Sequence, residues 1–165
     1  MKRASLAALM LVWALAVRAD VPLPGTLDNT AWQRVGSGSL DWFVLRVYDA
    51  TLWRGARGEA LAIRYARDIP GAALVDTTFD EMARLGVSDA ERWRAPLAGI
   101  FPDVKEGEVL VALREAGKGV AFFHQGRPVG RIVEAAFGEA FFGIWLDPRT
   151  REPALRAQLL GETRP

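Results

Sequence analysis

The chain has 165 residues, of which half are hydrophobic, a quarter are charged and a tenth are aromatic, and its formal net charge is +1. This profile is typical of one globular domain and excludes a collagen-like or disordered chain, and the near-zero charge argues against a nucleic-acid partner. Because there is no cysteine and His124 is the single histidine, a disulfide framework, a Cys/His metal site, an iron–sulfur cluster and a thiol nucleophile are excluded.

The first predicted element is an N-terminal targeting segment. A basic pair precedes an uncharged apolar run over residues 4–17, and small residues flank a cleavage point after Ala19. The run is shorter than the roughly 20 residues that a membrane-spanning helix needs, although a membrane anchor is the alternative reading. We therefore predict a signal peptide over residues 1–19 of a periplasmic or secreted protein. The remaining domain, residues 20–165, has 18 basic against 20 acidic side chains and no transmembrane segment.

The first half of this domain begins with strands. Residues 21–25 contain two prolines and a glycine, which predicts an extended lead-in. Residues 41–53 are rich in aromatic and β-branched side chains with alternating polarity, which predicts one long strand. A Gly-Ser-Gly-Ser turn at residues 36–39 would let residues 32–35 pair with that strand. Another half-buried strand is predicted over residues 60–67.

Two helices are expected next. The segment 72–85 carries apolar residues at helical spacing, and Gly86 is placed to stop it. Residues 88–91 have the Ser-x-x-Glu form of a capping box at the start of a helix. This second helix should be short, because Pro96 would end or kink it.

The second half of the domain predicts three more strands and two more helices. The strands cover residues 107–115, 120–125 and 128–133, and a glycine-rich hairpin loop joins the first two. Helices are expected over residues 134–145 and 153–160, from their 3.6-residue apolar period. We therefore predict a single domain of the α+β class.

No sequence motif for nucleotide binding or hydrolysis is present. Gly36 and Gly38 begin a G-x-G pattern, but Asp41 stands where a dinucleotide fingerprint needs its third glycine. There is no P-loop and no G-x-S-x-G elbow. His124 lies in an apolar strand and is interpreted as structural rather than catalytic. A strand arginine such as Arg34 can either extend into water or hold a ligand carboxylate.

Five segments of the chain resemble the bacterial chalcone-isomerase-like family. They are VYDATLW (47–53), LAIRYARDI (61–69), FPDVKEGE (101–108), HQGRPVGRI (124–132) and FFGIWLDPRTREPALRAQLLG (141–161). The last is the most specific, because it joins an aromatic helix, a WLDP motif and an R-x-x-L-L-G ending. The resemblance implies an open-faced β-sandwich, in which helices cover a large antiparallel sheet and a ligand cleft lies between them. It implies no cofactor.

The resemblance also implies site positions. Plant chalcone isomerases bind their substrate near an arginine and use threonine, tyrosine and asparagine groups, whereas fatty-acid-binding relatives hold a carboxylate with an arginine and a tyrosine. The matching positions here are Phe43 for the strand threonine and Leu74 for the helix tyrosine. Glu81 matches the asparagine and Gly138 the late-helix hydroxyl, so these polar groups are replaced. Losing them removes donors that stabilise an enolate-like oxygen and argues against an efficient chalcone isomerase.

An apolar cleft still suits an acyl chain, so we predict a non-catalytic periplasmic protein that binds a fatty acid or similar small amphiphile. The family arginine matches Arg34 or, after a shift across the predicted turn, Ser39. The predicted ligand-binding residues are Arg34 at the head group and Phe43, Leu74, Gly138 and Phe141 along the cleft. The alternatives are an intramolecular lyase or isomerase acting on a chalcone-like or other aromatic substrate, and a structural or interaction module without a ligand.

Overall fold

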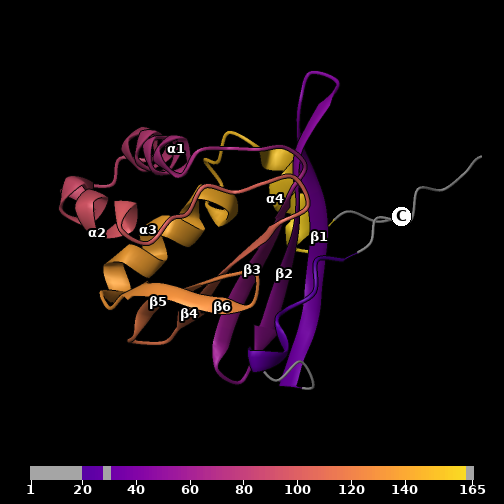
Figure 1. Ribbon diagram of the computed structural model, residues 1–165, viewed down its shortest axis with the longest axis horizontal. Helices are drawn as coiled ribbons and strands as arrows, with labels where there is room; N and C mark the ends of the chain where they lie inside the picture. Colours follow the sequence, from indigo (N-terminus) through magenta and orange to yellow (C-terminus); the bar gives the residue numbers. More distant parts are fainter. Residues whose placement is uncertain (1–19, 28–30, 163–165) are drawn as a thin grey trace, which may run out of the picture.

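The computed structural model describes residues 20–27 and 31–162, so the predicted signal peptide over residues 1–19 lies outside the described residues. Six strands form one antiparallel sheet in which each strand pairs with the next along the chain (Figure 1). They are β1 (Trp32–Trp42), β2 (Leu45–Gly55), β3 (Gly58–Tyr65), β4 (Val109–Glu115), β5 (Gly119–His124) and β6 (Arg127–Ile132).

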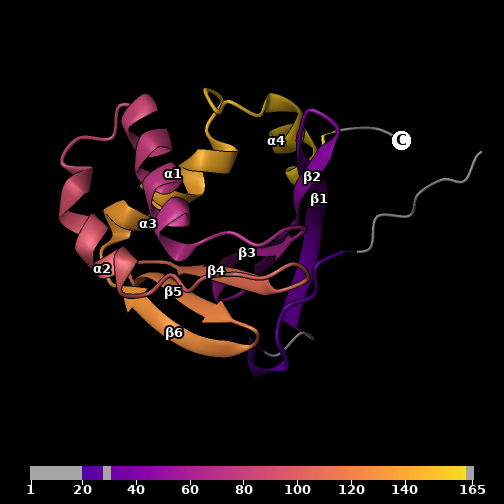
Figure 2. The same cartoon turned by 45° about the horizontal axis from the view of Figure 1, so that its top comes forward.

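Helices cover one face of this sheet (Figure 2). A helical insertion between β3 and β4 consists of α1 (Gly71–Arg84), the 3-10 turn η3 (Ala90–Trp93) and α2 (Arg94–Ala98). After β6, α3 (Ala135–Leu146) packs against α1 and β5, and α4 (Pro153–Leu159) packs against β1. The predicted α+β class and the open-faced, helix-covered antiparallel sheet are both confirmed.

The sheet separates two hydrophobic cores. Along β4, Leu110 and Ala112 belong to the core beneath the helices, on what we call the helix face. The alternate residues Val111 and Leu113 belong to a second core on the opposite side, which we call the outer face. Because successive strand residues point to opposite faces, a continuous apolar run can supply both cores.

The outer face is covered by residues 20–27, which we call the strap. Residues 20–24 are neither helix nor strand, and the short 3-10 turn η1 (Gly25–Leu27) follows them. Val21 is fully buried, and its backbone N–H donates to the hydroxyl of Thr51 at 2.8 Å. The indole N–H of Trp53 donates to the carbonyl of Val21 at 3.0 Å. The strap is therefore an integral layer of the domain.

The predicted turn at residues 36–39 is wrong. Strand β1 continues through this segment, and the chain reverses instead at Phe43 and Val44, between the paired residues Trp42 and Leu45. The glycines have a different role, which is to let α4 approach closely. A Cβ atom on Gly36 would lie 2.1 Å from the backbone oxygen of Gln158 in α4.

The predicted capping box does not form. Asp89, with φ of 56°, precedes η3, and no side chain caps it. Glu91 instead accepts a hydrogen bond of 2.8 Å from Arg94, and a charge-assisted bond of this kind outcompetes a neutral cap. Pro96 lies inside the short helix α2 rather than ending the preceding turn. The other predicted strands and helices are confirmed with their ends shifted by a few residues.

Candidate functional site

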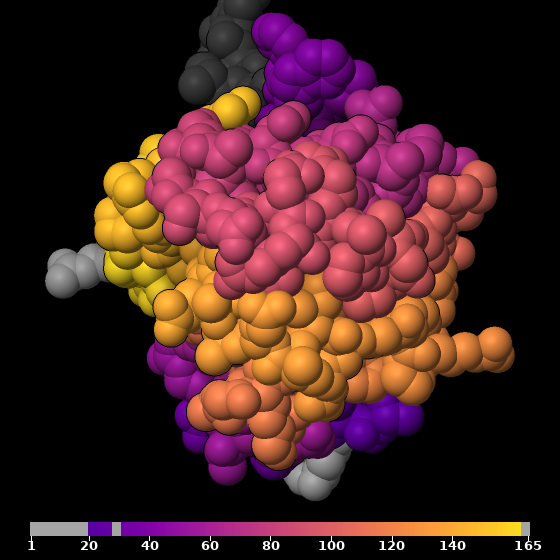
Figure 3. Space-filling view, turned by 90° about the vertical axis from the view of Figure 1, so that its left-hand side faces the viewer, coloured from indigo at the N-terminus to yellow at the C-terminus, as the bar shows by residue number. Residues whose placement is uncertain are grey.

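A cavity of about 340 Å³ lies between the helix face of the sheet and helices α1 and α3. Its wall is mostly apolar, with contributions from all the strands except β6. Seen from the side of the helices, α1, α2 and α3 form a continuous cover (Figure 3). This volume lies at the lower end of the range for small-molecule sites, so the cavity suits one narrow ligand.

The deep end of the cavity is aromatic. The ring of Phe122 on β5 meets Phe101 edge-on at 5.2 Å between centroids and Phe141 of α3 at 5.3 Å. All three side chains are buried, and Leu110 and Ala112 complete the floor. These residues offer no charged group to a ligand, so this end suits an apolar chain.

The mouth of the cavity lies between α1 and the segment that joins α3 to α4. Here the exposed side chains of Thr77, Arg151 and Glu152 line the opening. Arg151 is 62% exposed and pairs with the carboxylate of Glu81 at 3.1 Å. Arg84 holds the other oxygen of the same carboxylate at 2.8 Å. Glu81 therefore keeps a cationic partner even when Arg151 turns toward a ligand.

Both tyrosines of the chain line the cavity close to one another. Tyr48 on β2 stands directly opposite Tyr65 on β3, and their rings meet at 6.2 Å in an edge-on arrangement. The Tyr48 hydroxyl accepts a hydrogen bond of 2.8 Å from the indole N–H of Trp145, which leaves its own proton free to be donated.

The tyrosine hydroxyls are held in the neutral form. Burial raises the pKa of Tyr48 far above its usual range. The hydrogen bond from Trp145 acts to lower this pKa, and the negative charges of Glu152 and Glu81 act to raise it further. Burial, together with the neighbouring Tyr48, likewise raises the pKa of Tyr65. Within the described chain, no residue is hydrogen-bonded to the Tyr65 hydroxyl. The two groups can therefore donate to an oxygen of a ligand but cannot act as bases near neutral pH.

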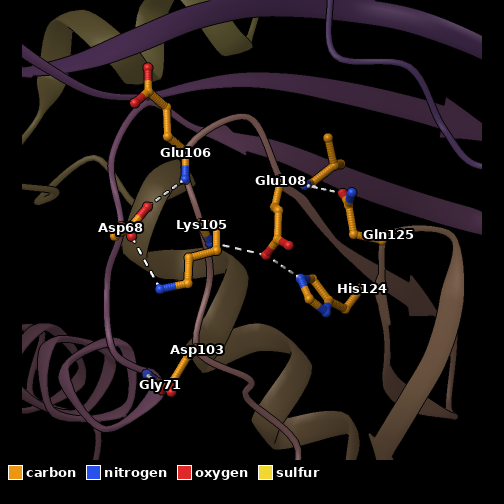
Figure 4. A network of polar contacts seen from close by, with 9 residues as sticks. Asp68, Gly71, Asp103, Lys105, Glu106, Glu108, His124 and Gln125 are labelled. Carbon is orange, nitrogen blue, oxygen red and sulfur yellow. Dashed lines mark hydrogen bonds and ion pairs between the residues drawn. The ribbon is translucent and has the colours of Figure 1, made fainter.

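A polar network joins the segment between β3 and α1 to the segment between α2 and β4 (Figure 4). Ile69, which lines the cavity, exchanges backbone hydrogen bonds of 3.0 and 2.9 Å with Val104. The carboxylate of Asp68 accepts from the backbone N–H of Glu106 at 2.9 Å. His124 contacts Glu108 at 2.9 Å at the edge of this network. His124 therefore has a structural partner and does not line the cavity.

The structure places only two of the predicted ligand-binding residues on the cavity wall, namely Leu74 and Phe141. Arg34 lies instead on the outer face, where it donates to Asp20 at 2.6 Å and to Ser37 at 2.8 Å. Because the sheet lies between Arg34 and the cavity, its assignment to the head group is corrected. The alternative, Ser39, does not line the cavity either.

Two further predicted positions also lie away from the cavity. Phe43 is 87% exposed at the end of the β1–β2 hairpin. The match of Phe43 to the family's strand threonine assumed one continuous strand over residues 41–53, whereas the chain turns at Phe43 and Val44. Gly138 packs within α3 against β4 and β5, where an added Cβ would lie 3.2 Å from the side chain of Arg114 and 3.6 Å from Val120. Its role is close packing.

Sequence reasoning missed Tyr48, Tyr65, Trp145 and Arg151. The tyrosines could have been found from the predicted strands. Tyr65 alternates with Leu61 and Ile63 within the predicted strand 60–67 and so shares their buried face, and an antiparallel register brings Tyr48 opposite it. No local signal indicates Arg151, whose position depends on how the link between α3 and α4 crosses the end of α1. The polar groups of this cavity are therefore present, but at other positions than the resemblance suggested.

Across residues 20–27 and 31–162, no helix is long and apolar enough to cross a membrane. In the same part of the chain, no group of three or more histidine or carboxylate side chains is placed to hold a metal ion.

Comparisons with known proteins agree with this architecture. The chalcone isomerase-like family matches residues 61–161. An uncharacterized protein of Haemophilus influenzae is 28% identical over 144 residues, which cover 81% of this chain and 70% of that protein. The fold is similar to the crystal structure of a fatty-acid binding protein from Arabidopsis thaliana, with a TM-score of 0.64 and 10% identity over 80% of this chain and 88% of that one. At that identity, the similarity shows a common fold.

Proposed function

The chain belongs to the chalcone isomerase-like family, and from this premise we propose that it binds a fatty acid or a similar single-chain carboxylate in the cavity between sheet and helices. The observation that carries the proposal is the polarity of the cavity, which is aromatic at its deep end and has hydroxyl and guanidinium groups toward its mouth. The plant neighbour with the same fold is named for fatty-acid binding, which supports this class of ligand.

The deep end would take the acyl tail. Each methylene buried against Phe101, Phe122 and Phe141 contributes about 0.8 kcal/mol of transfer free energy. The volume of about 340 Å³ favours a single chain over a lipid with two.

The mouth would hold the carboxylate head group. Arg151 can provide a two-pronged hydrogen bond, since Arg84 continues to neutralise Glu81. The hydroxyls of Tyr48 and Tyr65 can donate to an oxygen that enters further. This assignment replaces Arg34 by Arg151 as the cation at the head group.

An extracytoplasmic location is part of the proposal. The fold includes Asp20, whose carboxylate accepts hydrogen bonds from Arg34 and Ser37 at 2.6 Å. Val21 is buried under the outer face. A cleavage after Ala19 would thus leave a domain whose first residues are already part of its packing. Intact-mass measurement of the protein from a periplasmic extract would test this, and a protein that retains residues 1–19 would contradict it.

An isomerase acting on an aromatic ketone is the second candidate, and it is favoured by the Tyr48 hydroxyl, which Trp145 orients toward the cavity. A tyrosine hydroxyl held in this way by an indole N–H can donate a hydrogen bond to a carbonyl oxygen of the substrate and polarise it. The raised pKa of Tyr48 keeps its hydroxyl neutral, so this group is poorly suited to accept a proton. Both carboxylate oxygens of Glu81 are already held by arginines, one by Arg151 and the other by Arg84. The geometry therefore supports binding more strongly than proton transfer.

The experiment begins with native mass spectrometry of the purified protein, followed by solvent extraction of any bound molecule and titration with dodecanoate. We expect one acyl chain per protein and an affinity about tenfold weaker in Arg151→Ala, because a charge-assisted hydrogen bond is lost. Arg149→Ala is the matched control, since Arg149 pairs with Asp147 at 2.8 Å and does not line this cavity. Arg34→Ala should also leave the affinity unchanged.

Three results would contradict the proposal. The first is a wild-type protein that takes up no fatty acid. The second is an equal loss of affinity in Arg151→Ala and Arg149→Ala. The third is turnover of a chalcone that Tyr48→Phe abolishes, which would favour the isomerase instead.

A further inference from the structure

The end of the β1–β2 hairpin exposes four consecutive large apolar side chains, which we call the hairpin tip. Trp42 is 62% exposed, Phe43 87%, Val44 95% and Leu45 58%. Among the described residues, Val133 is the one other large apolar side chain with comparable exposure. In Figure 1 the hairpin extends beyond the rest of the molecule as a narrow projection. The tip is therefore a convex apolar surface that no described part of the chain covers.

The backbone of the tip shows that turn formation does not explain this sequence. Phe43 is the first central residue of a two-residue turn and has φ of 54°. Glycine, asparagine or aspartate occupies this left-handed region at little cost, whereas a bulky aromatic residue is strained there. A strained residue at a solvent-exposed position is a reason to look for a role of its side chain.

The charges at the base of the tip are paired with one another. Arg46 donates to Asp41 at 2.5 Å and to Asp49 at 2.6 Å, and Asp41 contributes to raising the pKa of this guanidinium. The base of the tip therefore presents no unpaired basic cluster that would attract an anionic surface. Whatever binds here must be held by apolar contact.

We propose that the hairpin tip inserts into the surface of a lipid bilayer. Tryptophan and phenylalanine are suited to the interfacial zone of a membrane, and a projecting tip can enter between head groups without a complementary groove. A second copy of the chain is a poorer fit. Four side chains bury on the order of 500 Å² per copy, less than the roughly 800 Å² per partner of a standard protein interface.

The position of the tip links a membrane surface to the cavity. Leu40, just before the tip, and Val47 and Tyr48, just after it, line the cavity. A bilayer that accepts the tip would therefore lie close to one end of the ligand site. Bilayer insertion itself rests on the exposed residues and not on the proposed function, so either can fail alone.

The test is sedimentation with phosphatidylcholine vesicles. Val44→Asp should reduce the vesicle-bound partition coefficient about tenfold, because it places a charge in the apolar zone. Val133→Asp is the matched control, since Val133 is 69% exposed at the end of β6 and lies away from the tip. It should bind within about twofold of the wild type, and Val44→Leu should keep the wild-type level. All proteins are expressed from the full chain, so residues 1–19 are treated equally in each.

Raising the salt concentration should leave wild-type binding unchanged, because apolar insertion is not screened. The proposal is overturned by a wild-type protein that does not sediment with vesicles, by equal binding of Val44→Asp and the wild type, or by dimerisation through the tip without vesicle binding.

Dodecanoate titration of Val44→Asp separates the membrane proposal from the ligand proposal. Retained dodecanoate affinity with lost vesicle binding is the expected result, and wild-type vesicle binding without dodecanoate uptake would remove only the ligand proposal.

Discussion

The two faces of the sheet are packed in different ways. The strap follows the outer face closely, over the small residues Ala60, Ala62 and Ala121. The helix face instead leaves a cavity of about 340 Å³ between the sheet and α1 and α3. An extended segment adjusts residue by residue to a surface, whereas a helix is a rigid rod of 10–12 Å diameter that contacts a sheet only where its side chains reach. Space for a ligand is therefore created on the side of the helices.

The sharpest way to break this comparison is to truncate one residue on each face. Leu113→Ala, in the fully packed outer core, should lower the free energy of unfolding by about 2–5 kcal/mol, because it opens a new void. Ile144→Ala, on the half-buried cavity wall, should cost only about 1 kcal/mol, because that side chain already faces open space. Urea denaturation of both variants measures the two values. Equal costs would mean that the cavity is closed in solution.

The converse experiment introduces a larger side chain on each face of the sheet. Ala62 and Ala112 are both buried in central strands, but Ala62 points to the outer core and Ala112 to the cavity. Ala62→Phe should destabilise the domain by about 1–3 kcal/mol through overpacking. Ala112→Phe should leave the melting temperature nearly unchanged and should weaken dodecanoate binding about tenfold or more, because the ring occupies the site. If Ala112→Phe is the more destabilised of the two, the comparison fails.

Acid should weaken both faces, because each has a carboxylate held by arginines, half-buried Glu59 on one and buried Glu115 on the other. Burial acts to raise the pKa of Glu59, on the helix face, but hydrogen bonds from Arg54 and Arg114 lower it below its ordinary 4.5. On the outer face, burial acts to raise the pKa of Glu115. The hydrogen bond from Arg57 and the nearby positive charges outweigh burial, so this pKa is also lowered. Both shifts stabilise the folded state above pH 4.5, and this stability is lost as the pH falls toward the folded pKa values.

Urea titrations at pH 7 and at about pH 3 measure this effect. We expect Glu59→Gln and Glu115→Gln each to be less stable than the wild type at pH 7, and the difference should shrink in acid. A constant difference across this range would show that neither carboxylate is stabilised by its arginine partners.

The candidate site illustrates the limit of sequence reasoning. The predicted wall residues Leu74 and Phe141 do line the cavity, because each lies on a helix that the sequence predicts from its apolar residues and that packs over the sheet. Arg34 was misplaced because the resemblance fixed its position along the chain but not which face of the sheet its side chain takes, and the predicted turn at the following glycines was wrong. Those glycines are explained only by the approach of α4, which lies more than a hundred residues further along the chain.

The sequence by itself determined the α+β class, most of the strands and helices, and the family, because apolar periodicity and short motifs are local properties of the chain. Only the tertiary structure decided which face of the sheet contains a cavity and which polar groups reach it. Tyr48 and Tyr65 meet through strand register, and Arg151 reaches the mouth through the packing of α1 against α3. Such groups come together through contacts between distant segments, and no local pattern encodes these contacts.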